Sequence, residues 1–365
     1  MFKHNHGLTQ LSAESLEVYK IAMRIWRRMG RVFWFAVALM LSLAVFAAPR
    51  LSAQNPPEMQ RIAFQIGTGP VSGSYLPMGE AIAFVISHPP GLGRCVTTNL
   101  CGPEGLIATT RSSSGSESNV QSVERGNVQS ALVQGDIAIA AFGGFGPFAD
   151  TGALKDLRAI ARLHDETLQI VASSRSRVKR LKDLVGKRVA IDASNSATEF
   201  TFRNVLNAAG VKFSALKVRR VPLETAATQL QDGSVDAIVV IGLAPVSSVD
   251  QLMRRGYGRL VGLDGKTLQR LIRRNSAYTK VSLAAGTYRS SKLISTLGIA
   301  SFWLVNKDQP TAIVSQILRS FWHASNQSEL RKRGLFAATL DRKKATHVSS
   351  VPLHEGARRF YAARR

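Results

Sequence analysis

Two short segments carry glycines and hydroxyl residues where a strand would give way to a helix. The first begins at Gly67 and contains the candidate binding residues Gly69, Ser72, Ser74 and Tyr75. The backbone N–H groups and the positive end of a helix start would attract an anion there. The spacing predicts neither a P-loop, which needs a closing Gly-Lys-Ser/Thr, nor a dinucleotide-binding turn. An ordinary strand-to-helix turn uses the same residues, so this segment alone does not decide the function.

A second segment of the same type lies in the other half of the chain. Behind a predicted strand come four candidate binding residues at the start of a helix: Ser194, Asn195, Ser196 and Thr198. A capping box made by Ser196 and Glu199 explains this pattern equally well. Two such helix starts, one in each half, favour a small anionic solute held between two helix N-termini. Ligands of open α/β sheets lie at the carboxyl ends of the strands, which is where both segments are predicted.

Gln134 and Asp136 directly follow a third predicted strand, over residues 131–133. They would face the same crevice if the strands are parallel. We take Gln134 as a candidate binding residue, whereas for Asp136 we favour a role in the turn.

No pattern for catalysis or for a metal is present. The sequence has no G-x-S-x-G nucleophile and no H-E-x-x-H, and its histidines are scattered, so we expect no catalytic residue, no metal site and no cofactor. The formal net charge of +24 favours acidic partners: anionic solutes, anionic lipid headgroups or nucleic acid. No helix-turn-helix, RNA-recognition or zinc-finger motif accompanies this charge, so we expect no nucleic-acid partner.

The first 53 residues have the layout of an export signal. Small residues follow an apolar run over residues 32–48, which is preceded by four arginines: Arg24, Arg27, Arg28 and Arg31. Cleavage after position 48 or 53 would release the remainder into the periplasm. An uncleaved leader would instead tether the protein to the inner membrane, because the run is at the short edge of the spanning length. Translation from Met23 or Met29 is a further alternative.

The two cysteines, Cys95 and Cys101, are predicted to form a local disulfide in that oxidising compartment. Two thiols without a nearby histidine or third cysteine do not complete a zinc site. The alternative is a pair of free, buried thiols.

Strand-like and helix-like segments alternate along the rest of the chain, which predicts the α/β class, with mainly parallel sheets flanked by helices. Strands are expected at 61–66, 95–100, 131–133, 157–163, 168–173, 188–192, 217–221 and 235–241. Helices are expected from Ser74 onwards and at 118–125, 181–186, 196–209 and 224–231. The segments 125–133 and 232–240 resemble each other, which is either the common end of any αβ unit or a sign of two related lobes.

Several segments together resemble the TAXI family of TRAP-transporter solute receptors. The opening Ile66-Gly-Thr-Gly-Pro-Val-Ser-Gly-Ser-Tyr-Leu-Pro-Met-Gly79 is similar to the start of that family. Further similar segments follow in the family's order and cover roughly residues 61–361: 101–105, 115–120, 131–136, 157–161, 181–189, 196–199, 236–237, 245, 263–265, 285–288 and 352–357.

The resemblance implies a two-lobed periplasmic-binding-protein fold (type II-like) with a hinge between the lobes. Residues 1–53 would be the signal peptide or anchor, 54–177 with 276–365 lobe one, and 178–275 lobe two. The family's positions place Thr68, Ser72, Tyr75 and Gln134 on one wall of the site, and Ser196, Thr198 and Pro245 on the other. Where the family's second wall usually has Gly-Ser-Gly-Thr-Glu, side chains here replace two of the glycines, and residues 239–244 lack the family's polar and aromatic residues.

The implied function is capture of a small anionic solute, a carboxylate or an amino acid, for delivery to the permease subunits of a TRAP-type transporter. We expect the receptor to be a monomer. A stand-alone solute sensor or scaffold acting on a membrane signalling partner is the alternative. An enzyme on the same fold would need an activated acid, base or nucleophile in the crevice, and the sequence offers none.

Overall fold

The computed structural model describes residues 17–30, 34, 40, 61–71, 73–192, 196–289, 292–334, 338–348 and 350–363. The chain divides into two units, Met1–Glu58 and Met59–Arg365. In the first unit, residues 17–30 are helical. Within the described ranges, no helix combines the length and the apolar character needed to cross a membrane. Most of the apolar run predicted at 32–48 lies outside those ranges.

The second unit is built on one ten-stranded sheet with the order β2-β1-β3-β10-β4-β7-β5-β6, while β8 pairs with β4 and β9 with β10. The strands are β1 Ile62–Gly67, β2 Leu106–Arg111, β3 Ser130–Gln134, β4 Leu157–Ser173, β5 Arg188–Ile191, β6 Lys217–Arg220, β7 Ala237–Gly242, β8 Gly258–Val261, β9 Tyr278–Leu283 and β10 Ile294–Asn306.

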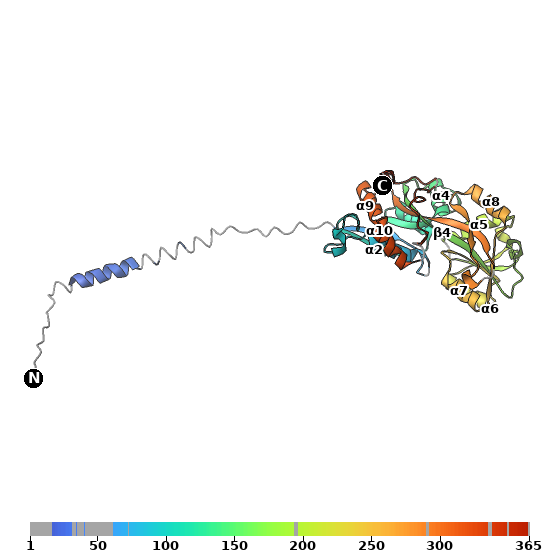
Figure 1. Cartoon of the computed structure of the whole chain (residues 1–365), viewed down its shortest axis with the longest axis horizontal. Coiled ribbons are helices and arrows are strands. Elements are labelled where there is room, and N and C mark those ends of the chain that lie inside the picture. Colours follow the sequence, from blue (N-terminus) through green and yellow to red (C-terminus); the bar gives the residue numbers. More distant parts are fainter. Residues whose placement is uncertain are drawn as a thin grey trace, which may run out of the picture. The chain divides into compact units, whose positions relative to one another are not determined.

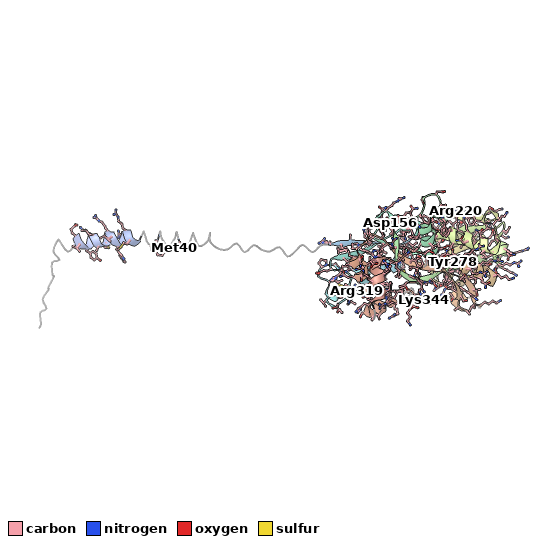
Figure 2. The ribbon with its side chains drawn as sticks, turned by 90° about the horizontal axis from the view of Figure 1, so that it is seen from above. Met40, Asp156, Arg220, Tyr278, Arg319 and Lys344 are labelled. Carbon is pink, nitrogen blue, oxygen red and sulfur yellow. A yellow bond between two sulfur atoms is a disulfide. The ribbon has the colours of Figure 1, made fainter. Side chains whose placement is uncertain are left out.

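Helices cover this sheet, and Figure 1 shows α2, α9 and α10 grouped at one end of it and α5 to α8 at the other. The helices are α2 Tyr75–Ile86, α3 Ser116–Glu124, α4 Gly135–Gly143, α5 Ala197–Ala209, α6 Leu223–Asp232, α7 Ser247–Arg254, α8 Gly265–Arg274, α9 Thr311–Phe321, α10 Ala324–Arg333 and α11 Glu355–Ala362. In Figure 2, Asp156 and Arg319 are labelled at the first end and Arg220 and Tyr278 at the second.

Two sets of parallel strands form the two ends of the sheet. Strands β1, β2 and β3 are parallel in one set, and β5, β6 and β7 in the other. The long strands β4 and β10 join the sets and run antiparallel to their neighbours. The first part of β4, up to Thr167, pairs with β10, and the part from Thr167 to Ala172 pairs with β7. The predicted α/β class is confirmed, but the sheet is mixed rather than mainly parallel because of these two strands.

The apolar stripes that predicted the helices are buried against the sheet. At one end, Phe64, Ile82, Trp303 and Phe321 belong to one hydrophobic cluster. At the other end, α5 buries Phe202, Val205 and Leu206 in a second cluster, at the spacing that its sequence predicts. Gly210 ends α5 in the left-handed conformation, with φ of 72°, which glycine adopts without steric cost.

Two predictions about the elements are wrong. The two strands expected at 157–163 and 168–173 are the single strand β4, because the polar stretch between them also pairs within the sheet. Residues 95–100 do not form a strand, and a 3₁₀ turn covers Gly93–Val96. Strand β2, helix α4 and the elements that follow β7 were not predicted. The disulfide between Cys95 and Cys101 is confirmed.

Candidate functional site

A cavity of about 370 Å³ lies where the parallel strands of both sets end. It is lined by the turns that follow β1, β2, β3, β5, β6 and β7, so each of the six parallel strands contributes its carboxyl end. The lining residues are Gly69, Pro70, Gly73, Ser74, Tyr75, Ser114, Gly115, Ser116, Gln134, Glu166, Ile191, Asp192, Ser196, Ala197, Thr198, Val221, Pro222, Leu223, Ala226, Val239, Val240, Ile241, Gly242, Leu243, Pro245, Val246 and Ser247.

In the described part of the chain, six helices begin at this cavity. The first residues or N-caps of α2, α3, α4, α5, α6 and α7 are all among the lining residues. Helices that follow parallel strands start at the carboxyl edge of the sheet, so their N-termini converge there. Because each N-terminus carries partial positive charge and free N–H groups, the convergence favours a negatively charged group in the cavity.

The wall next to β1–β3 holds a buried carboxyl group. Glu166, on β4, is 4% exposed and lines the cavity. The hydroxyl of Ser74 donates a hydrogen bond to its Oε1, and the phenol of Tyr75 donates one to its Oε2, each at 2.8 Å. Burial raises the pKa of Glu166 to about 7, although both hydroxyl hydrogen bonds act in the opposite direction. A proton on Glu166 is therefore gained or lost near neutral pH.

Other titratable groups surround Glu166. Burial raises the pKa of Tyr75 well above its usual value, and the charge of Glu166 adds to that shift. His164, two positions along β4, contacts the Tyr75 ring edge-to-face, and burial lowers its pKa to about 4, so its ring is neutral at pH 7. Asp136 is fully buried, and its charge contributes to the raised pKa of Glu166. Glu166 thus has acidic and neutral groups near it.

Two buried polar groups of the cavity wall have no hydrogen-bond partner among the described residues. They are Nε2 of Gln134 and Oγ of Ser196, on side chains that are 6% and 5% exposed. Gln134 precedes α4 and Ser196 precedes α5, so the two groups come from opposite ends of the sheet. An unpaired buried donor costs free energy unless a ligand accepts its hydrogen bond. Both groups can donate to an acceptor such as a carboxylate.

The opposite wall, next to β5–β7, is mainly hydrocarbon. Its apolar lining residues are Ile191, Ala197, Val221, Leu223, Ala226, Val239, Val240, Ile241, Leu243 and Val246. Among the described lining residues, none is Lys or Arg. The high net charge of the protein is therefore carried outside this cavity.

Seven of the predicted binding residues line the cavity: Gly69, Ser74, Tyr75, Gln134, Ser196, Thr198 and Pro245. Thr68 is not among them, because its hydroxyl donates to the carbonyl of Arg111 and its side chain is fully buried. Ser72, Ser194 and Asn195 lie outside the described residues. A role in binding stays a prediction for all of these residues.

Neither predicted helix cap uses its side chain as expected. Ser74 makes no capping hydrogen bond, because its hydroxyl is directed to Glu166. The capping box predicted for Ser196 and Glu199 is wrong: Ser196 makes no capping bond, and Glu199 pairs with Arg203 and Arg220 at 2.6 Å. Each hydroxyl is thereby left on the cavity side of its helix.

Sequence reasoning missed Glu166. It lies between the two strands predicted for this region, where a charged residue indicates a turn. Its partners Ser74 and Tyr75 are more than 90 positions away, so only the sheet order brings them together. One signal could have found it: Glu166 is an acidic residue in a segment, 157–173, that reads as one long strand and ends in a hydrophobic run.

A metal centre is not evident in the part of the chain that the structure describes, where no three His, Cys, Asp or Glu side chains are grouped to hold an ion. The cavity therefore offers hydrogen-bond donors, one buried carboxyl group and a hydrocarbon wall, which together suit the binding of an organic molecule.

Comparison with known proteins gives a family and several similar folds. The periplasmic sulfonate-binding protein SsuA of Methylobacillus flagellatus is 15% identical, covering 75% of this chain and 73% of that chain, with a TM-score of 0.44. SsuA of Xanthomonas axonopodis pv. citri, bound to MOPS, is 16% identical, covering 84% and 86%, with a TM-score of 0.40. A TctC solute-binding protein from Polaromonas is 16% identical, covering 78% and 88%, with a TM-score of 0.43.

These structural scores are low, so the assignment rests on the family model. The model described as the NMT1-like family matches residues 66–363, from the end of β1 to the end of α11. The matched segment includes the end of β1, all the other parallel strands and all the cavity-lining residues. The chain belongs to the NMT1-like family.

Proposed function

We propose that this protein is an exported receptor that captures a small solute with an anionic group and delivers it to a TRAP-type membrane transporter. The observation that carries the proposal is the convergence of six helix N-termini on one cavity, where groups of Gln134 and Ser196 also have no partner among the described residues. A carboxylate between these two side chains would accept both hydrogen bonds and would also lie in the positive field of the helix ends.

Capture needs no chemical step. The two ends of the sheet would act as lobes with the predicted boundaries, 54–177 with 276–365 and 178–275. Among the described strands, the β10–β4 pair joins the two sets, with β10 next to β3 and β4 next to β7, and bending there would close the cavity. A solute that contacts both walls binds the closed state better and shifts the equilibrium towards it.

Export and the transporter class rest on sequence. The basic and apolar pattern of residues 1–53 supports secretion into the periplasm. The ordered segments that resemble TAXI receptors support a TRAP-type partner. Cell fractionation tests the first point, and the second is tested by whether uptake of the bound solute is lost when either the receptor or the permease is deleted.

Solute capture is tested by thermal unfolding of residues 54–365, which contain the whole compact unit, against carboxylates, amino acids and sulfonates. A ligand at 100 times its dissociation constant should add about 2.7 kcal/mol to the free energy of unfolding, a shift of several degrees. Ser196→Ala should reduce that shift, whereas Ser248→Ala, outside the cavity lining, should not. Absence of any shift, with mass spectrometry of the denatured protein excluding a retained solute, would overturn the proposal.

A further inference from the structure

The two walls of the cavity differ in chemistry. Hydroxyl, amide and carboxyl groups line the wall next to β1–β3, from Ser74, Tyr75, Ser116, Gln134 and Glu166. Side chains of valine, leucine, isoleucine and alanine dominate the wall next to β5–β7. A solute that touches both walls must itself have a polar end and an apolar end.

The polar end of such a solute would face the carboxyl group of Glu166, which accepts hydrogen bonds. Each oxygen of Glu166 already accepts one hydrogen bond, from Ser74 and from Tyr75. A carboxylate has about four acceptor positions, so two remain for a ligand. Among the described residues, no positive charge lies beside Glu166 to attract a second anion, because Asp136 and Tyr75 add none and His164 is neutral. While Glu166 is ionised, a ligand group beside it therefore has to donate.

The apolar end faces hydrocarbon side chains, which give a charged group no hydrogen bond. Burying an ionised carboxylate costs several kcal/mol unless it is paired. Val221, Leu223, Val240 and Leu243 line this wall, and the described cavity residues include no Lys or Arg to pair with a second carboxylate. A hydrocarbon group in the same place gains from burial instead.

We infer that the solute has a head that carries a carboxylate together with a hydrogen-bond donor, an ammonium or hydroxyl group directed at Glu166, and an apolar body that packs on Val221, Leu223, Val240 and Leu243. This inference rests on the proposed function and specifies the class of solute. Dicarboxylates and acidic amino acids are disfavoured by the second wall, and simple fatty acids by Glu166.

Four probes of similar size separate the two parts of the inference. Leucine has the donor and the hydrocarbon body, 4-methylpentanoate lacks the donor, aspartate lacks the hydrocarbon, and succinate lacks both. Measured by calorimetry with residues 54–365, leucine should bind most tightly. Loss of the donor should weaken binding about tenfold or more. Shortening leucine to valine and then to alanine should weaken it about fourfold for each buried methylene.

Two variants assign these effects to the walls. Glu166→Gln keeps the size of the side chain and should weaken leucine binding strongly while leaving 4-methylpentanoate unchanged or improved. Leu243→Asn, of similar shape, should weaken leucine and 4-methylpentanoate alike and leave aspartate unchanged. Ser248→Ala, outside the cavity lining, is the matched control and should change none of the four affinities.

The pH dependence gives an independent readout. An ammonium beside Glu166 stabilises its ionised form, so binding releases a proton near pH 7 and affinity for leucine should rise from pH 6 to pH 8. A plain anion would instead take up a proton, and its affinity would fall over the same range. Asp136, Tyr75 and His164 are other titratable groups near Glu166: burial raises the pKa of Asp136 and of Tyr75 and lowers that of His164 to about 4. Asp192 lines the same cavity, and burial raises the pKa of Glu117, in the first turn of α3, to about 7. The same titration is therefore run on Glu166→Gln, in which only the contribution of Glu166 is missing.

The outcomes distinguish this inference from the proposed function. If succinate or aspartate binds at least as tightly as leucine and Glu166→Gln changes nothing, the solute class is wrong although capture of an anion stands. If none of these probes binds but another carboxylate or sulfonate does, the solute class is likewise wrong. If no anionic solute of any class binds and none is retained from purification, the proposed function fails as well.

Discussion

The phenol of Tyr278 donates a hydrogen bond to the carboxylate of Asp136 at 2.8 Å, joining residues 142 positions apart. Tyr278 begins β9, and Asp136 lies in the first turn of α4, next to the polar wall of the cavity. The same oxygen accepts a hydrogen bond from Thr201 on α5 at 2.5 Å, and the other oxygen accepts one from the N–H of Ile137. Asp136 thus connects helices and strands from both ends of the sheet, beyond the turn role that the sequence favoured.

This arrangement predicts that Asp136→Asn destabilises the protein. One carboxylate oxygen becomes an NH₂ group that cannot accept, so at least one hydrogen bond is lost at a fully buried position. The expected loss in the free energy of unfolding is about 1–3 kcal/mol, a fall of a few degrees in melting temperature. Asp150→Asn, at an exposed position, is the control and should change the melting temperature little. Equal melting temperatures for the two variants would show that these hydrogen bonds contribute nothing.

The carboxyl group of Glu166 predicts a pH-dependent stability. Its pKa is raised to about 7 in the folded protein and is roughly 4.3 in an unfolded chain. Between these values the folded state binds one proton more than the unfolded state, so the free energy of unfolding falls as pH rises through this window. The contribution lost between pH 5 and pH 8 is about 2–3 kcal/mol.

Urea unfolding of the wild type and of Glu166→Gln at pH 5 and pH 8 measures this contribution. The wild type should lose stability relative to the variant as pH rises, because glutamine does not titrate. Glu199→Gln is the matched control: its arginine partners lower the pKa of Glu199, so its titration lies below this window. A difference between wild type and Glu166→Gln that stays constant with pH would mean that Glu166 is ionised throughout.

The local sequence pattern predicted the elements in which apolar residues recur at the spacing of a helix or fill a strand. The spacing of Phe202, Val205 and Leu206, closed by Gly210, predicted α5 because one face of a helix must be apolar to pack on a sheet. Strand β3 was predicted from the apolar run at 131–133, which follows a turn at Gly126, and all of its residues are buried in the structure. The carboxyl ends of such strands placed Gln134 and Ser196 near one crevice, and both line the cavity.

Features that depend on distant parts of the chain could not be predicted. Helix α4 is short and apolar on most sides, so its sequence has no helical stripe to distinguish it from a buried strand. Ser74 has the pattern of a helix cap, but the buried oxygen of Glu166 takes its hydroxyl instead. No local rule predicts this hydrogen bond, because its acceptor lies in the middle of β4. That stretch fell between the two strands predicted at 157–163 and 168–173.

Removal of the disulfide should lower the stability of the protein without weakening solute binding. Cys95 and Cys101 close a loop of only six positions, so replacing both by serine should cost roughly 2 kcal/mol. The loop also docks on α10, where Asn326 donates to the carbonyl of Leu100 at 2.7 Å, which limits the unfolding of the segment. Thermal unfolding should show the same melting temperature for the double variant with and without a reducing agent, whereas the wild type should fall to that value on reduction.

Ligand affinity is the internal control for this change, because neither cysteine lines the cavity. Affinity for any bound solute should be the same in the wild type and in the double serine variant. A weaker affinity in the variant would mean that the disulfide loop influences the cavity through α2, and it would contradict the separation of the two regions.

Replacing Gln134, whose amide has no partner among the described residues, should raise the stability of the protein and weaken solute binding. Its Nε2 has no partner among the described residues and its side chain is 6% exposed, so methionine, of similar length, should remove a buried unsatisfied donor. The ligand-free Gln134→Met protein should be more stable than the wild type by about 1 kcal/mol. Its affinity for an anionic solute should fall about tenfold, since the donor that the solute would satisfy is gone.

Gln129→Met is the matched control for this prediction. Oε1 of Gln129 accepts a hydrogen bond from the N–H of Gln65 at 2.8 Å, so the same replacement there should lower stability. Gln129 does not line the cavity, and its variant should bind solute as the wild type does. Thermal unfolding with and without solute measures both effects. A Gln134→Met protein that is less stable, or that binds as tightly as the wild type, would show that this amide is satisfied in the folded protein and is not reserved for a ligand.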